Sequence, residues 1–236
     1  MKIKLLVAAA ATVMASSAMA QSAFQGFYGQ IATGYENNSV SGLNITASEP
    51  SLGSETWNAS NQSFGGAPLV IGLGYNFSIA PKWLLGIGID YSALSQKSSS
   101  FSTTTPDGGT FGGQTLEASN RYNIFVTPGY VIDKDKLVYL KAGYSGVTVK
   151  ATEPNSFTEG GMTVTGPAGS QSKTLSGYVV GLGYKQIITG GFYGFAEANY
   201  MSYSKSTFSS TSDGLTTSVN PSMSSYQALV GVGYRF

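Results

Sequence analysis

Three short glycine motifs are the first candidates for a chemical site in this chain. The tetrad Gly-x-Gly-Tyr occurs at 72–75, 181–184 and 231–234. Two glycines around one apolar residue belong to the pattern by which a loop cradles phosphate, provided that the loop joins a strand to the start of a helix. The chemistry of the tetrads therefore depends on the elements that contain them.

The chain lacks most of the side chains that usually act as nucleophiles or bind metals. The chain contains neither His nor Cys, which excludes Ser-His-Asp and Cys-His nucleophiles, His-ligated zinc, disulfides and His- or Cys-ligated haem. The 12 carboxylates are scattered, and none of their runs has the spacing of a calcium loop. The sequence predicts no enzyme, no catalytic residue, no cofactor and no metal site.

Residues 1–20 have the pattern of a cleaved secretory signal peptide. Lys2 and Lys4 precede an apolar run from Leu5 to about Met14, and Ala18-Met19-Ala20 forms a small-x-small cleavage site. A membrane anchor would need about 20 apolar residues, more than this run offers. We therefore expect residues 21–236 to be exported as one domain. That domain has 11 basic and 12 acidic side chains and no basic patch to attract nucleic acid.

Strand periodicity fills the exported domain. Eight stretches alternate between apolar residues and small or polar ones, and turn-rich segments separate them. They cover approximately 24–35, 64–78, 83–96, 117–132, 137–150, 173–188, 192–206 and 223–236. No later run reaches the roughly 18 apolar residues of a helical membrane span. The sequence predicts an all-β domain.

The connections between these stretches alternate in length. Three are tight, at 79–82, 133–136 and 189–191, and four are long, at 36–63, 98–116, 151–172 and 207–222. This alternation is typical of an eight-stranded antiparallel up-and-down barrel with all its long loops at one end.

Side-chain volume decides which face of each strand looks outward. In the third stretch Trp83, Leu85 and Ile87 alternate with glycines and Asp90. A soluble, lipocalin-like barrel would put the bulky set inside, but the interior of eight strands is too narrow to hold it. We predict a transmembrane barrel with a lipid-facing bulky set. The tetrad glycines then lie in the lumen phase of strands, which is not a phosphate loop.

Several segments together resemble one known family. GLGYN at 72–76, PGYVID at 128–133, GLGYK at 181–185 and the terminal GVGYRF make the chain similar to the small Gram-negative outer-membrane barrels, OmpA-like and OmpX-like. The resemblance covers the whole exported domain. It implies short periplasmic turns, four long extracellular loops, and contact with outer-membrane lipid and lipopolysaccharide. It also implies that Tyr234 and Phe236 are read by the β-barrel assembly machinery, although Phe236 alone also fits a plain interfacial aromatic.

Charged residues in the lumen phase form the candidate site. Alternation points six of them inward: Asp90, Arg121, Lys141, Lys185, Glu197 and Arg235. Because an unpaired charge is costly away from water, we expect partial pairing that fills the lumen, with Arg121 and Glu197 in one network. Pro128 cannot donate a ladder hydrogen bond, so we expect a bulge at Pro128-Gly129.

The long loops are the expected recognition surface. Their aromatic residues are Trp57, Phe101, Phe111, Phe157 and Phe208, and their acids are Glu36, Glu49, Glu55, Asp107, Glu117, Glu153, Glu159 and Asp213. The leading hypothesis is a non-enzymatic envelope scaffold that presents these loops for adhesion or interaction with a ligand on a host or neighbouring cell. The alternative is a narrow ion or small-solute channel. The loops also fit plain hydrated tips without a ligand.

Overall fold

The computed structural model describes residues 22–49, 53–212 and 214–236. The predicted signal peptide lies outside these ranges, as does Asp213. In the described part of the chain, no helix is long and apolar enough to cross a membrane.

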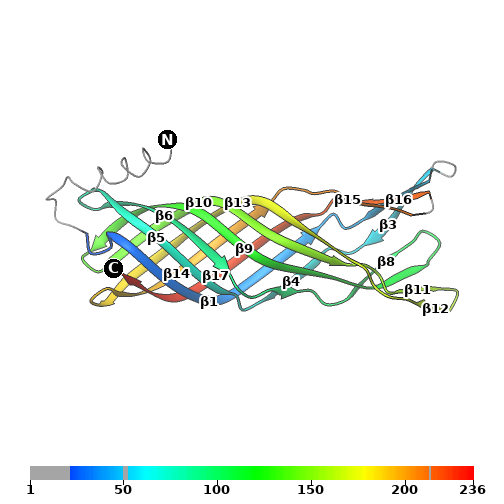
Figure 1. Ribbon diagram of the computed structural model, residues 1–236, viewed down its shortest axis with the longest axis horizontal. Coiled ribbons are helices and arrows are strands. Elements are labelled where there is room, and N and C mark those ends of the chain that lie inside the picture. The colour runs from blue at the N-terminus through cyan, green and yellow to red at the C-terminus, as the bar shows by residue number, and fades with distance from the viewer. Residues whose placement is uncertain (1–21, 50–52, 213) are drawn as a thin grey trace, which may run out of the picture.

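Eight long strands of the described chain close into a barrel (Figure 1). They are β1 (Gly26–Ser41), β5 (Leu69–Ala80), β6 (Trp83–Ser92), β9 (Thr110–Asp133), β10 (Lys136–Thr152), β13 (Ser170–Thr189), β14 (Phe192–Tyr203) and β17 (Ser222–Arg235). Each pairs antiparallel with the next, and β1 pairs with both β5 and β17. Closure leaves the barrel without an edge, which lipid requires because it cannot hydrogen-bond a free backbone group. The predicted architecture is confirmed.

The long connections contain strands of their own. The described residues hold nine further strands there: β2 (Ile45–Glu49), β3 (Gly53–Ala59), β4 (Gln62–Gly66), β7 (Gln96–Lys97), β8 (Phe101–Thr104), β11 (Ser156–Glu159), β12 (Met162–Thr165), β15 (Phe208–Ser212) and β16 (Leu215–Val219). Thr, Val and aromatic residues in these segments favour strands. The sequence analysis did not predict these strands, because abundant Ser and Gly masked their alternation.

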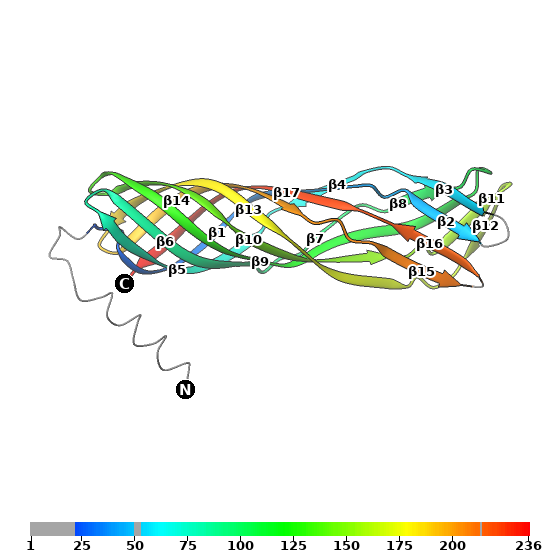
Figure 2. The same cartoon turned by 90° about the horizontal axis from the view of Figure 1, so that it is seen from above.

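These added strands continue the cylinder beyond the barrel, at the end away from the C-terminus (Figure 2). Their pairing runs β15–β16–β2–β3–β8–β9–β11–β12. We call this region, with the outer ends of β9, β10 and β13, the loop extension. It is a sheet anchored on the barrel strands, so it is held in place by backbone pairing as well as by side chains.

The outer face of the barrel is apolar, as the alternation predicts. Ile87 is 48% exposed and Leu182 is 62% exposed, whereas Leu84 and Val179, one position out of phase, are buried. Aromatic pairs gather near the short turns and again toward the loop extension. The first group is Phe27–Tyr75, Trp83–Tyr130 and Phe192–Tyr234, and the second is Tyr122–Tyr144, Tyr178–Tyr200 and Tyr200–Tyr226. Two such groups on an apolar surface match the girdles of a membrane barrel.

The inner face contains large aromatic side chains as well as the small and polar ones that we expected. Tyr28, Phe125, Tyr139, Tyr193 and Phe195 are buried inside. Each lies directly across from a glycine on the next strand: Gly74, Gly88, Gly183, Gly233 and Gly231 respectively. A Cβ on any of these glycines would strike the facing ring. Four of the six tetrad glycines, and Gly88, therefore make room for aromatic rings in a narrow lumen.

Pro128 does not form the bulge that we expected. Pairing between β9 and β10 lapses at Thr127 and Pro128 and resumes in the same register, while Pro128 still pairs with Leu85 of β6. The strand β9 therefore accommodates the missing N–H of Pro128 without the inserted residue of a bulge. The register shift in the middle of β9 lies instead beside Asn120, whose φ of 49° is in the left-handed region.

The glycine–aromatic pairs predict that Gly183→Val destabilises the barrel by about 1 to 3 kcal/mol, because the new side chain overpacks the Tyr139 ring. Unfolding by urea in lipid vesicles, followed by gel mobility of the unboiled protein, measures the change. Gly166→Val is the matched control, since a Cβ there meets nothing within 4 Å. Equal urea midpoints for the two variants would contradict the packing role.

Candidate functional site

Lys141 is the centre of a charged cluster in the lumen. Its side chain projects inward from β10 and is almost fully buried. The ammonium nitrogen Nζ donates to Asp90 Oδ2 on β6 at 2.7 Å and to Glu197 Oε1 on β14 at 2.9 Å. Three strands on different sides of the barrel are thus joined across its interior. Such pairing offsets the cost of removing three charges from water.

The remaining oxygens of the two carboxylates also have partners. Asn123 Nδ2 donates to Asp90 Oδ1 at 2.6 Å, and the Tyr139 hydroxyl donates to Glu197 Oε2 at 2.7 Å. The Lys141 ammonium lies 4.2 Å from the centroid of the Phe125 ring. Full satisfaction of these atoms makes the cluster a fixed support rather than a set of loosely hydrated charges.

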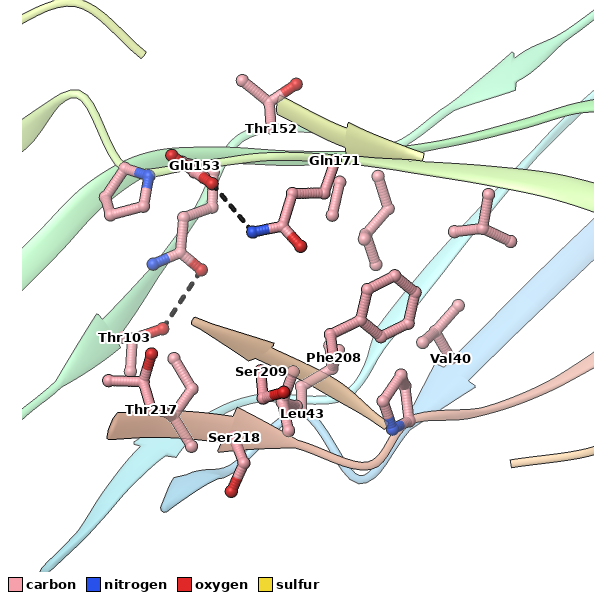
Figure 3. A pocket seen from close by; sticks show the side chains of 18 of the residues that line it. Val40, Leu43, Thr103, Thr152, Glu153, Gln171, Phe208, Ser209, Thr217 and Ser218 are labelled. Atoms are coloured by element: carbon pink, nitrogen blue, oxygen red, sulfur yellow. Dashed lines mark hydrogen bonds between the residues drawn. The ribbon is translucent and has the colours of Figure 1, made fainter. Parts of the chain in front are cut away.

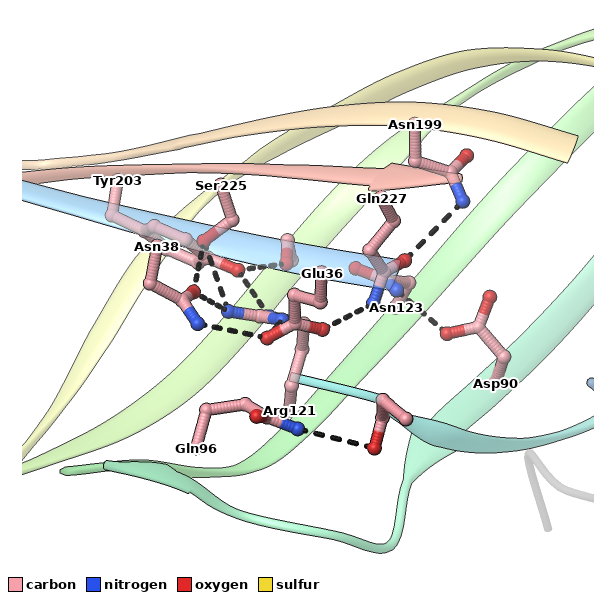
Figure 4. A network of polar contacts seen from close by, with 12 residues as sticks. Glu36, Asn38, Asp90, Gln96, Arg121, Asn123, Asn199, Tyr203, Ser225 and Gln227 are labelled. Atoms are coloured by element: carbon pink, nitrogen blue, oxygen red, sulfur yellow. Dashed lines mark hydrogen bonds and ion pairs between the residues drawn. The ribbon is translucent and has the colours of Figure 1, made fainter. Parts of the chain in front are cut away.

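Arg121 forms a second cluster, closer to the loop extension (Figure 4). Its guanidinium forms a buried ion pair with Glu36 of β1. Nη2 also donates to Asn38 Oδ1 at 2.7 Å, and Nε donates to the Tyr203 hydroxyl at 3.0 Å. Five N–H groups on a planar fork suit this many acceptors.

Glu36 and Glu117 do not lie in long loops, where we expected them. Strand β1 runs to Ser41 and β9 begins at Thr110, so both acids lie on barrel strands. The signal for Glu36 was present, because it continues the inward phase of Gln30 by steps of two. The expected stretch ended at residue 35, so Glu36 was counted with the loop that follows it.

Arg121 and Glu197 do not touch, but hydrogen bonds connect them. Gln227 Nε2 donates to Glu36 Oε2 at 2.6 Å, and Asn199 Nδ2 lies 3.4 Å from Gln227 Oε1 and 2.8 Å from Glu197 Oε1. Figure 4 shows Gln227 between Glu36 and Asn199. The two charged clusters are therefore parts of one network, joined by two amide side chains.

In the described chain, the other two predicted lumen charges form no ion pair with these clusters. Lys185 has no ion pair among the described residues, and its Nζ is 4.0 Å from the Tyr28 ring centroid and 3.2 Å from Gln30 Oε1. The ring face and the amide oxygen stabilise the cation in place of a carboxylate. Arg235 is only partly buried near the short-turn end, where Nη1 lies 3.3 Å from the Gln25 carbonyl oxygen. The six predicted residues thus form one triad around Lys141, an ion pair of Arg121 with Glu36, and two side chains outside both, Lys185 and Arg235.

Little free space remains beside the Lys141 cluster. The cavity bounded by Tyr28, Leu84, Tyr139, Lys185 and Glu197 has a volume of about 10 Å³, roughly the 10 to 15 Å³ that one water needs. Ion pairs and rings therefore occupy the barrel cross-section at this level.

The C-terminal aromatics lie on the outer surface. Phe236 is 75% exposed, and its backbone N–H donates to the Phe27 carbonyl at 2.9 Å. Tyr234 stands between the rings of Phe192 and Phe236, with centroids at 4.8 and 5.1 Å. The final strand therefore presents an aromatic ladder to the lipid side.

The loop acids that the structure describes do not form a cluster. Over residues 22–49, 53–212 and 214–236, no group of three or more acidic side chains is placed to hold an ion. Three loop aromatics do come together, because Trp57 stacks on Phe111 at 5.3 Å and Phe111 contacts Phe157 at 4.7 Å.

Comparison with known proteins agrees with this architecture. A family model described as outer membrane protein beta-barrel domain matches residues 6–236. The chain belongs to this family. This outer-membrane β-barrel protein therefore resides in the outer membrane of a Gram-negative cell. No curated protein sequence matches it significantly.

Several solved outer-membrane proteins are similar to this family member at low identity. The Pseudomonas aeruginosa protein OprG is 13% identical, with a TM-score of 0.53 over 92% of this chain and 99% of that one. The Escherichia coli protease OmpT is 11% identical, with a TM-score of 0.49 over 94% and 100% of the two chains. The Yersinia pestis attachment protein Ail is 15% identical, with a TM-score of 0.36 over 90% and 99%. The likeness to OprG supports the fold and nothing finer.

The Lys141 cluster of this outer-membrane barrel makes a stability prediction. Lys141→Met leaves Asp90 and Glu197 buried without their cation, and we expect a loss of about 3 to 5 kcal/mol in unfolding free energy. Urea unfolding in vesicles measures the loss. Adding Asp90→Asn and Glu197→Gln to the same variant removes the uncompensated charges and recovers most of the stability.

Lys136→Met is the control for this prediction. Lys136 is an exposed partner of Asp133 at 3.8 Å, and we expect its removal to change stability by less than about 0.5 kcal/mol. If the Lys141 and Lys136 variants unfold at the same urea concentration, the triad does not stabilise the barrel.

Proposed function

We propose that this protein is a non-enzymatic scaffold of the outer membrane, and that the loop extension, not the lumen, is its working surface. The observation that carries the proposal is the pair of charged clusters around Lys141 and Arg121, which occupy the lumen below the loop extension. A barrel with this interior offers solutes no continuous path. Interaction with the outside is then left to the strands beyond the membrane.

The form of the extension supports a presenting role. Backbone pairing ties β2 and β3 to β8 and β9, so the outer strands are anchored to a barrel strand. A scaffold that holds its surface in one arrangement lowers the entropic cost of binding a partner. We propose a ligand on a host or neighbouring cell as that partner, with outer-membrane lipid and lipopolysaccharide around the barrel.

We propose a separate role for the C-terminal strand in assembly. Tyr234 and Phe236 both face outward, where another protein can reach them before insertion. This supports recognition of the strand by the assembly machinery. The aromatic ladder that they form with Phe192 serves the inserted barrel equally well.

Ion conductance in a planar bilayer separates the scaffold from the alternative channel. We expect refolded protein, whose barrel is verified by its mobility shift on boiling, to give no discrete current steps. Arg121 and Lys141 fill the lumen, so replacing both with Gly is the positive control that should open a path. Reproducible steps in the unmodified protein that change in Arg121→Ala or Glu197→Ala would make it a channel.

Shortening the extension tests the presenting role. Replacement of residues 155–166, which contain β11 and β12, by an Asn-Gly turn should leave the barrel folded, because this hairpin pairs only with the outer end of β9 in the described chain. We expect cells that display the shortened protein to lose attachment to epithelial cells or to one another. Surface biotinylation controls for equal display. Unchanged attachment at equal display would contradict the proposal.

A further inference from the structure

We propose that the loop extension contains a binding site for a small neutral amphiphile, with an apolar body and one hydrogen-bond-accepting oxygen. The site is a cavity of about 370 Å³ above the charged clusters, which we call the mouth cavity. Residues that line it include Leu43, Trp57, Leu175, Phe208, Val219 and Met223. Figure 3 shows Phe208 among the side chains that converge on it. Its volume is within the range of small-molecule sites, about 300 to 1,000 Å³.

The floor of the mouth cavity is apolar. Val40, Leu116, Val149, Leu175 and Met223 line it and belong to one buried cluster. Tyr203 belongs to the same cluster and accepts a hydrogen bond from Arg121, so apolar side chains separate the cavity from the charges below. A ligand body that enters this space leaves water and contacts hydrocarbon, which favours an alkyl chain or ring.

One polar atom in the wall has no partner. The indole N–H of Trp57 is buried and makes no hydrogen bond in the structure. Stacking on Phe111 at 5.3 Å holds the ring. A buried donor without an acceptor is costly, and an oxygen of a bound molecule would satisfy it. The donor therefore indicates a hydroxyl, ether or carbonyl oxygen on the ligand.

The charge at the rim disfavours an acidic head group. Glu153 lines the mouth cavity and accepts a hydrogen bond from Gln171 Nε2 at 3.0 Å, as Figure 3 shows. Glu153 has no ion pair in the described ranges. A carboxylate or phosphate on the ligand would lie near this negative charge, whereas an alcohol or ester would not be repelled.

The wall of the cavity has a seam through which a ligand can enter. The ladder between β13 and β14 ends at Gly177 and Tyr203. Beyond it Gln171 pairs with β10 and Phe208 pairs with β16, and both line the cavity. Within the described residues, β15 pairs with β16 alone. Lys173 Nζ crosses the seam to the Thr207 carbonyl at 3.0 Å. A side chain, not a backbone ladder, closes this side.

Intrinsic fluorescence tests the site directly, because the chain has only two tryptophans, Trp57 and Trp83. In a Trp83→Phe protein in lipid nanodiscs, Trp57 is the only reporter. We expect ω-bromoundecanol, whose bromine quenches nearby indoles, to quench Trp57 saturably. The Trp57→Phe protein is the matched control, since Trp83 is 51% exposed on the outer face and reports only partition into the bilayer. Its quenching should rise without saturation.

Two related probes and one variant define the chemistry. Bromoundecane lacks the acceptor, and ω-bromoundecanoate carries a negative charge, so each should need roughly tenfold more probe for half-quenching of Trp57. Val219→Asp places a charge in the wall from β16, outside the barrel strands, and should abolish the saturable component while the gel mobility shift is retained.

The inference is overturned if Trp57 and Trp83 are quenched alike, if Val219→Asp has no effect, or if the bromoalkane and the carboxylate match the alcohol. It rests on the proposed function only in taking the extension as the working surface. A conducting barrel would refute the scaffold and leave the quenching result standing. Loss of saturable quenching in a silent barrel would refute the mouth cavity alone.

Discussion

Closure of an eight-stranded sheet in lipid is the constraint on which the rest of this protein depends. Lipid cannot satisfy backbone groups, so β1 must pair with both β5 and β17. A ring of eight strands leaves an interior that side chains alone must fill. Rings therefore face glycines, as Tyr139 faces Gly183, and charges must find partners inside, as Lys141 does. Packing and electrostatics in the lumen both follow from its width.

The lumen changes character along its axis. The middle holds the Lys141 and Arg121 clusters, which are joined through Gln227 and Asn199. Toward the loop extension the buried side chains become apolar, with Val147 and Val179 fully enclosed. Above them the extension opens into the mouth cavity. The charged layer stabilises the barrel. The apolar layer lies between the charged layer and the loop extension.

Much of this architecture could be predicted from alternation, because one periodicity controls both faces of a strand. The inward orientation of Asp90, Lys141 and Glu197 follows from it. The partner of Arg121 did not follow, since Glu36 was assigned to a loop. The inward orientation of the Tyr28 and Tyr193 rings did not follow either. An aromatic residue in the lumen phase can be recognised only together with the glycine that faces it on the neighbouring strand. Cross-strand register is a tertiary property.

The sequence by itself determined the eight strands, the three tight turns, the apolar outer face and the family, since each depends on residues close together in the chain. Only the tertiary structure decided the contacts between distant strands. Closure placed Lys141 between Asp90 and Glu197, joined Arg121 to Glu36, and brought Trp57 against Phe111 in the loop extension. The physical reason is that alternation gives the side of the sheet on which a residue lies, whereas shear and register around a closed ring set its neighbours.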